Sequence, residues 1–175
     1  MKLPPASFSM RFHDSDTKRK FAFLAAAAFS LGISQLSSYL VHAHLQLETT
    51  YAVNWFLHLT EVQNTGGVFG SFQGNSVLFA LLSGSLLLGI SFYTLRTRSV
   101  GVFEGCAIGL LTGGGASNVL DRLLYGAVID FIDIQNIPYW HYIFNTADVM
   151  IHIGGWSLLI RFLFFRRSEH SVAPG

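Results

Sequence analysis

Four long apolar stretches separate this chain from an ordinary soluble domain. They cover residues 21–41, 77–95, 101–120 and 148–165. Each is close to the length of about 20 residues that an α-helix needs to cross the apolar core of a bilayer. Of the 175 residues, 51% are hydrophobic and only 12% are charged, whereas about a quarter of a soluble domain is charged. We therefore predict an all-α membrane protein built as a bundle of four transmembrane helices.

Lysine and arginine are unevenly distributed between the segments that flank these stretches. Segment 42–76 contains neither residue, and segment 121–147 contains only Arg122. The other basic residues lie in the first 20 residues, in segment 96–98 and after residue 160. Because cytoplasmic segments are enriched in Lys and Arg, both termini are predicted to be cytoplasmic. This predicts a cytoplasmic arm (1–20), a four-span domain (21–165) and a cytoplasmic tail (166–175).

The first apolar stretch has an alternative interpretation as a cleaved signal peptide, because Val41-His42-Ala43 resembles a cleavage site. Its apolar run is longer than the roughly 7–15 residues of a signal peptide's apolar region, which favours an uncleaved anchor. This stretch also contains Ser30, Ser34, Gln35, Ser37 and Ser38. It is therefore expected to pack inside the bundle.

The segments predicted to lie outside the cytoplasm carry signs of β-structure and of a bilayer surface. Residues 51–63 partly alternate between apolar and polar side chains, which predicts a strand, and 64–67 read Asn-Thr-Gly-Gly, a turn. A small extracytoplasmic sheet is therefore expected. Asn64 either belongs to its turn only or hydrogen-bonds a bound backbone. The aromatic residues of 132–142 predict an interfacial loop or helix between the third and fourth spans.

Polar and small residues mark two faces of the third stretch. Gly101, Gly105, Gly109 and Gly113 recur every four residues, which favours close helix packing. Asn118, Asp121 and Arg122 share one face at its end and are expected to form an inward polar cluster. The alternative is a solvated helix end with a local contact between Asp121 and Arg122.

Asp130 and Asp148 are the candidate catalytic residues. Asn145 and Asp148 begin the fourth stretch and could serve as a helix cap, but Asp130 lies between Ile129 and Phe131 with no such explanation. Two adjacent carboxyl groups tend to share one proton, so one can take a proton from water while the other polarises a carbonyl. If they converge, they form an acid–base pair able to hydrolyse an amide. Neither metal-ligand spacings nor a basic nucleic-acid stripe occurs in the sequence.

Four segments, in this order, closely resemble the lipoprotein signal peptidases, also called signal peptidase II, a family of aspartic proteases of the bacterial membrane. They are Asn64 to Phe69, Gly114 to Arg122, Val128 to Phe131, and Phe144 to Asp148. The resemblance extends over residues 21–165. It implies a monomeric inner-membrane enzyme with its site at the outer face, under a sheet and an aromatic loop that cradle the substrate.

The resemblance also implies a substrate and a set of site residues. The substrate is a prolipoprotein whose lipobox cysteine carries diacylglycerol, and cleavage occurs just before that cysteine, without metal or organic cofactor. Besides membrane lipids, no other partner is implied. Asp130 and Asp148 match the catalytic pair. The residues that match the family's supporting and substrate-binding positions are Asn64, Gly66, Asn118, Asp121, Arg122 and Asn145.

One departure from the family pattern lies in the first span. The family has an Asp-Gln phrase followed by a Lys, and here the stretch reads Ser34-Gln35-Leu36-Ser37-Ser38, without either charge. This leaves a diverged, inactive homologue that binds lipidated signal peptides as an alternative function. A small transporter that uses Asp121, Asp130 and Asp148 as a proton relay is a second alternative, and it requires carboxylates at mid-membrane depth.

Overall fold

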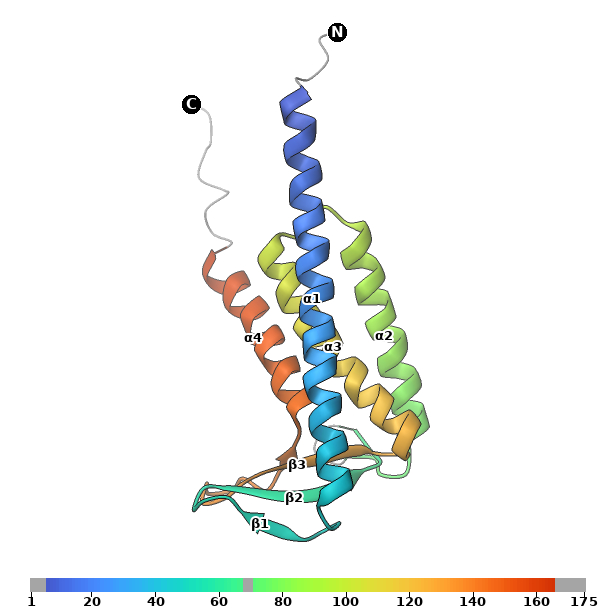
Figure 1. Cartoon of the computed structure of the whole chain (residues 1–175), viewed down its shortest axis with the longest axis vertical. Helices are drawn as coiled ribbons and strands as arrows, with labels where there is room; N and C mark the ends of the chain where they lie inside the picture. The colour runs from blue at the N-terminus through green and yellow to red at the C-terminus, as the bar shows by residue number, and fades with distance from the viewer. Residues whose placement is uncertain (1–5, 68–70, 166–175) are drawn as a thin grey trace.

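The computed structural model describes residues 6–67 and 71–165. Its helices are α1 (Ala6–His44), α2 (Ser76–Arg96), α3 (Val102–Tyr125) and α4 (Thr146–Phe165). Its strands are β1 (Thr50–Ala52), β2 (Leu57–Asn64), β3 (Val128–Ile134) and β4 (Ile143–Phe144). The helices run side by side, and the sheet lies across one end of them (Figure 1). The tail 166–175, Val68 and Phe69, all named in the sequence-based predictions, lie outside the described residues.

Three of the described helices are long and apolar enough to cross a bilayer: α1 from Ser15 onward, α2 and α4. The predicted count of four spans is not confirmed, because α3 does not belong to this group. The buried face of α3 consists of Gly, Ala, Thr, Ser and Asp side chains rather than large apolar ones. α3 packs against each of the other three helices, so protein rather than lipid surrounds much of its surface.

The glycines of α3 allow this close packing, as predicted. A Cβ added at Gly109 would lie 2.4 Å from the carbonyl oxygen of Phe23 in α1, and one at Gly113 would lie 2.3 Å from that of Ala27. On the other side, a Cβ at Gly114 would lie 2.5 Å from the carbonyl oxygen of Ala147 in α4. α1 and α4 therefore approach α3 at distances that a side chain would forbid.

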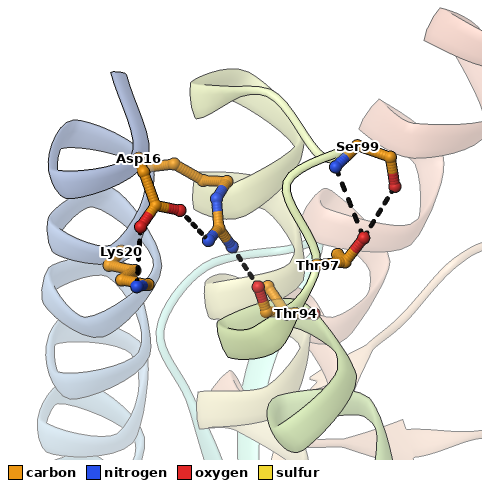
Figure 2. A network of polar contacts seen from close by, with 6 residues as sticks. Asp16, Lys20, Thr94, Thr97 and Ser99 are labelled. Carbon is orange, nitrogen blue, oxygen red and sulfur yellow. Dashed lines mark hydrogen bonds and ion pairs between the residues drawn. The ribbon is translucent and has the colours of Figure 1, made fainter. Parts of the chain in front are cut away.

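A buried arginine joins α1 to α2 at the end of the bundle remote from the sheet. The guanidinium of Arg19 donates to the backbone carbonyl of Thr94 and to the carboxylate of Asp16 (Figure 2). Asp16 also pairs with Lys20 at 2.7 Å. Because Arg19 is paired with the Asp16 carboxylate, its charge can be buried between the helices, while Lys20 remains exposed to its surroundings.

The sheet is antiparallel, in the order β1-β2-β3-β4. The single strand predicted over 51–63 is wrong, because the chain reverses between β1 and β2. The side-chain oxygen of Asn54 accepts hydrogen bonds from the backbone amides of Phe56 and Leu57, both at 2.8 Å, and this turns the chain. Of the predicted interfacial loop or helix over 132–142, the loop is present: residues 135–142 connect β3 to β4, and no helix occurs between Val128 and Asn145.

A bulge in β2 sets which side chains face Asp130. Leu59 pairs with Ile132, but Val62 pairs with Asp130, so β2 contains one extra residue between these two pairs. Asn64 therefore lies on the same face as Asp130, as its diagonal neighbour. Without the extra residue, Asp130 would pair with Glu61, and Asn64 would point to the opposite face.

The sheet is attached to the bundle through β3. α3 is capped by Gly126, the residue after its end, whose φ of 75° is a left-handed conformation that suits glycine. The chain enters β3 two residues later. Ile129 and Phe131 of β3 are buried against Val41 in the last turns of α1. Asp130 is therefore held at the junction between sheet and helices.

The packing of α3 predicts a stability difference between two glycine substitutions. We expect Gly113→Ala to destabilise the protein by about 1–3 kcal/mol, because the new methyl group would overlap the backbone of α1. Thermal unfolding in detergent measures this as a lower Tm. Gly89→Ala in α2 is the matched control, since a Cβ there meets no atom within 4 Å. An equal fall in Tm for both variants would contradict this account of α3.

Candidate active site

Asp130 lies in the middle of β3 with only 5% of its surface exposed. Its Oδ1 atom accepts a hydrogen bond of 2.8 Å from the side-chain amide of Asn145, and its Oδ2 atom accepts one of 3.2 Å from that of Asn64. Because the bulge in β2 turns Asn64 toward this face, both donors converge on one carboxyl group. Asn64 thus ends β2 in a turn and also contacts the candidate site.

Asp148 lies in the first turn of α4. Its Oδ1 atom accepts a hydrogen bond of 2.9 Å from the side-chain amide of Asn118. Its Oδ2 atom accepts from the backbone amide of Asn145 at 3.3 Å, and its own amide donates to Oδ1 of Asn145 at 2.9 Å. This reciprocal pair is a capping box, so the predicted helix cap is present. The cap and the candidate site share the same atoms.

Asn145 connects the two candidate catalytic residues. It is 1% exposed. Its side-chain nitrogen contacts Asp130, and its backbone amide and side-chain oxygen contact Asp148. Its side chain also donates to the side-chain oxygen of Asn118 at 3.1 Å. The structure therefore brings Asp130 and Asp148 to one site, with three amide side chains around them.

The surroundings of Asp130 make its carboxyl group a weak acid. Burial is the main cause, the negative charge of Asp148 adds to it, and together they raise the pKa of Asp130 to about 7. The hydrogen bonds from Asn64 and Asn145 and the positive charge of Arg122 act in the opposite direction but do not compensate. A carboxyl group with this pKa can accept or release a proton at neutral pH.

The three polar residues at the end of α3 have different partners. Asn118 faces Asp148, as described above. Asp121 is fully buried and faces α1, where it accepts hydrogen bonds from Gln35 and Ser38. Arg122 donates to the carbonyl oxygen of Gly66 at 2.7 Å and so fixes the turn after β2. The alternative of a local Asp121–Arg122 ion pair is not observed between these two described residues.

Two glutamines of this region were not predicted from the sequence to belong to the site. Gln73 donates to the side-chain oxygen of Asn64 at 3.3 Å, which leaves the amide nitrogen of Asn64 directed toward Asp130. Its only sequence signal was its position after a glycine-rich turn. Gln35 was part of the polar stripe of the first span, which predicted packing but no particular partner.

No three His, Cys, Asp or Glu side chains come together as a potential metal site within the described part of the chain. The predicted absence of a cofactor stays a prediction.

Apolar helices with two carboxyl groups held at one end by a shared asparagine are typical of a membrane enzyme with a carboxyl pair in its site. A family model described as signal peptidase (SPase) II matches residues 26–164. The chain belongs to the signal peptidase II family.

Individual relatives agree with this assignment. A lipoprotein signal peptidase of Clostridioides difficile is 37% identical over 136 residues, which cover 77% of this chain and 90% of the relative. One of Fusobacterium nucleatum is 34% identical over 139 residues, covering 78% and 83%. The fold is similar to a bacterial membrane enzyme solved in meso at 2.3 Å, with a TM-score of 0.76 and 26% identity over 87% of this chain and 94% of the other. A second such enzyme has a TM-score of 0.72 and 28% identity, over 82% and 93%.

The raised pKa of Asp130 predicts how stability depends on pH. An aspartate in the unfolded chain has a pKa of about 3.9, whereas the folded chain holds this proton up to about pH 7. The contribution of Asp130 to stability is therefore complete below about pH 4 and is lost as the pH rises through about 7. We expect the Tm of the unmodified protein in detergent to fall over this range relative to that of Asp130→Asn. Asp133→Asn removes another carboxyl group from β3 and should retain the fall. Parallel Tm curves for the unmodified protein and Asp130→Asn would refute the assignment.

Proposed function

We propose that this chain is an aspartic endopeptidase that removes the signal peptide from diacylglyceryl-modified prolipoproteins, cleaving just before the lipidated cysteine. Family membership supports a protease that processes signal peptides. The aspartic mechanism rests on one observation: Asn145 contacts both Asp130 and Asp148, so the two carboxyl groups lie at one site. No finding favours the inactive alternative.

The proposed reaction uses one proton shared by the two carboxyl groups. The ionised group takes a proton from water, and the oxygen of that water attacks the scissile carbonyl carbon. The protonated group donates to the carbonyl oxygen as the C–O bond forms. When the resulting tetrahedral intermediate collapses, the C–N bond breaks and the nitrogen of the new N-terminus takes a proton from the dyad. One hydroxyl of the intermediate returns its proton to the dyad as the new carboxyl group forms, so the pair again shares one proton. No covalent enzyme intermediate is needed, and neither role belongs permanently to one residue.

The supporting residues act by fixing the two carboxyl groups. Asn64, Asn118 and Asn145 donate amide hydrogen bonds to them, which limits the rotation of each carboxyl group. Arg122 holds the turn at Gly66 and lowers the pKa of Asp130 by its charge. Preorganised donors of this kind need no rearrangement when charge develops in the transition state.

The position of the site suits a substrate that is half lipid. The dyad lies where the apolar helices meet the sheet, so a diacylglyceryl group could remain in the bilayer while the peptide crosses the site.

We propose a topology of four membrane spans, in which α3 is the span shielded from lipid by its neighbours. Both termini would be cytoplasmic and the site would be at the outer face, because basic residues are rare in 42–76 and 121–147. The enzyme is proposed to act as a monomer in the inner membrane.

The alternative of a proton relay receives no support from this geometry. A relay needs carboxylates along the depth of the membrane. Asp121, Asp130 and Asp148 instead lie together near the end of the bundle that carries the sheet.

The proposed dyad predicts a selective loss of cleavage. We expect Asp130→Asn or Asp148→Asn to abolish the shortening of a diacylglyceryl-modified prolipoprotein by the purified protein in detergent, since an amide can neither take the proton of water nor donate as an acid. Asp133→Asn is the control on β3. Its carboxylate accepts from Thr60 at 2.9 Å and from Gln135 at 2.7 Å, without contacting the dyad, and cleavage should persist.

Two outcomes would contradict separate parts of the proposal. Near-normal cleavage by either dyad variant would refute the aspartic mechanism. Equal cleavage of the unlipidated precursor would refute the substrate class while leaving the mechanism intact.

The proposed topology predicts opposite labelling of two loops. With Cys106→Ala removing the natural thiol, a cysteine introduced by His141→Cys should react in intact spheroplasts with a membrane-impermeant maleimide. One introduced by Ser99→Cys should react only after the membrane is opened. Both parent residues are exposed, so the thiols should be accessible. The reverse pattern would invert the orientation, and equal labelling of both positions would contradict the span count.

A further inference from the structure

Asp121 is a fully buried carboxylate that is held by three donors from two different elements. The side-chain nitrogen of Gln35 in α1 lies 2.7 Å from its Oδ1 atom. The hydroxyl of Ser38, one turn further along α1, donates to Oδ2 at 3.1 Å, and the backbone amide of Ile129 in β3 donates to the same atom at 3.3 Å. The amide groups of Gln35 and Ile129 act here as donors, so both oxygens of the Asp121 carboxyl group act as acceptors.

The donors from α1 occupy the stretch where this chain departs from its family. Gln35 is the glutamine of the Ser-Gln phrase, and Ser38 stands where the family resemblance places a lysine. A neutral hydroxyl thus replaces a cation beside Asp121. The nitrogen of Gln35 also lies 3.0 Å from the hydroxyl oxygen and 3.1 Å from the carbonyl oxygen of Ser117, which fixes the amide group between α1 and α3.

The backbone amide of Ile129 links this cluster to the dyad, because Ile129 directly precedes Asp130. A hydrogen bond from this amide to Asp121 anchors the start of β3 to α3 and, through α3, to α1. The carboxyl group of Asp130 must keep its position relative to Asn64 on β2 and Asn145 on α4, and a shift of β3 would alter both contacts.

We propose that Gln35 and Ser38 are positioning residues for catalysis: they hold the Asp121 carboxylate, which holds the Ile129 amide and thereby sets the position of Asp130. Neither residue touches the dyad, so their effect is transmitted through Asp121 and the backbone of β3. The effect of β3 on catalysis rests on the proposed function. The structural link from α1 through Asp121 to β3 is independent of that function.

Hydrogen exchange of β3 in the full-length protein tests the structural step without any substrate. Valine and threonine have nearly the same shape, but only threonine has a hydroxyl. We therefore expect Ser38→Val to accelerate exchange of the Ile129 amide about tenfold, the order expected for loss of one buried hydrogen bond, and Ser38→Thr to leave it near the parent rate. Gln35→Met is a second variant that removes the other α1 donor, should Ser38→Val not fold.

Ser30→Ala is the matched control, since it also removes a buried hydroxyl of α1. Ser30 donates to the carbonyl oxygen of Leu110 at 2.8 Å and has no contact with Asp121. In the Ser30→Ala variant, hydrogen exchange of the Ile129 amide should stay at the parent rate. Equal exchange in Ser38→Val and Ser38→Thr, with no effect of Gln35→Met, would overturn the inference. So would an acceleration by Ser30→Ala as large as that by Ser38→Val.

Cleavage kinetics on a lipidated precursor test the catalytic step. We expect Ser38→Val and Gln35→Met to lower kcat about tenfold with little change in KM, because the substrate still binds while the dyad is displaced. Ser38→Thr should restore kcat. If exchange at Ile129 rises while kcat stays at the parent value, the two residues serve stability only and the positioning role is refuted. If the unmodified protein does not cleave, the proposed function fails, and the exchange result still decides whether α1 holds β3.

Discussion

The burial of carboxylates at the end of an apolar bundle is the constraint on which this structure depends. A buried carboxyl group is costly unless hydrogen-bond donors surround it. Asp121 and Asp130 are both buried, and both are surrounded by such donors. Their donors come from parts of the chain that are far apart in sequence, such as Gln35, Asn64 and Asn145. The helices and the sheet must therefore meet at this place for either aspartate to be tolerated. Packing of the glycine face of α3 against α1 brings the first of these donors within reach.

Much of the architecture followed from local sequence patterns, and the exceptions have local or long-range causes. Apolar length identified α1, α2 and α4, and glycine spacing identified the close face of α3. The strand predicted over 51–63 was wrong because a single side chain, Asn54, turns the chain within an otherwise alternating pattern. The bulge in β2 had no signal at all, since it is defined only by pairing with a strand some 70 residues later. Register of this kind depends on tertiary contacts.

The candidate site was predictable as a set of residues but not as a geometry. Asp130 is distinctive in the sequence because an acid between two apolar side chains has no local explanation. Asn145 and Asp148 are distinctive because they begin a helix. Their contact could not be inferred, as it depends on where β3 and α4 meet. Asn118, Asp121 and Arg122 do share one face of α3. Positions three and four residues apart still differ in direction around the helix, and neighbouring elements on each side supply different partners.

The two buried aspartates differ in how many donors they have and in what lies beside them. Asp121 accepts from a backbone amide and two side chains, all neutral, and no acid is among these partners. Asp130 accepts from two side-chain amides and experiences the charge of Asp148, so its pKa rises to about 7. The first arrangement fixes a carboxyl group between α1 and β3, and the second places a group with a pKa near neutrality beside Asp148. A lysine beside Asp121 is not needed for the first role, because three neutral donors can hold a carboxylate when helix packing aligns them. The loss of charge from the first span is therefore compatible with a working dyad.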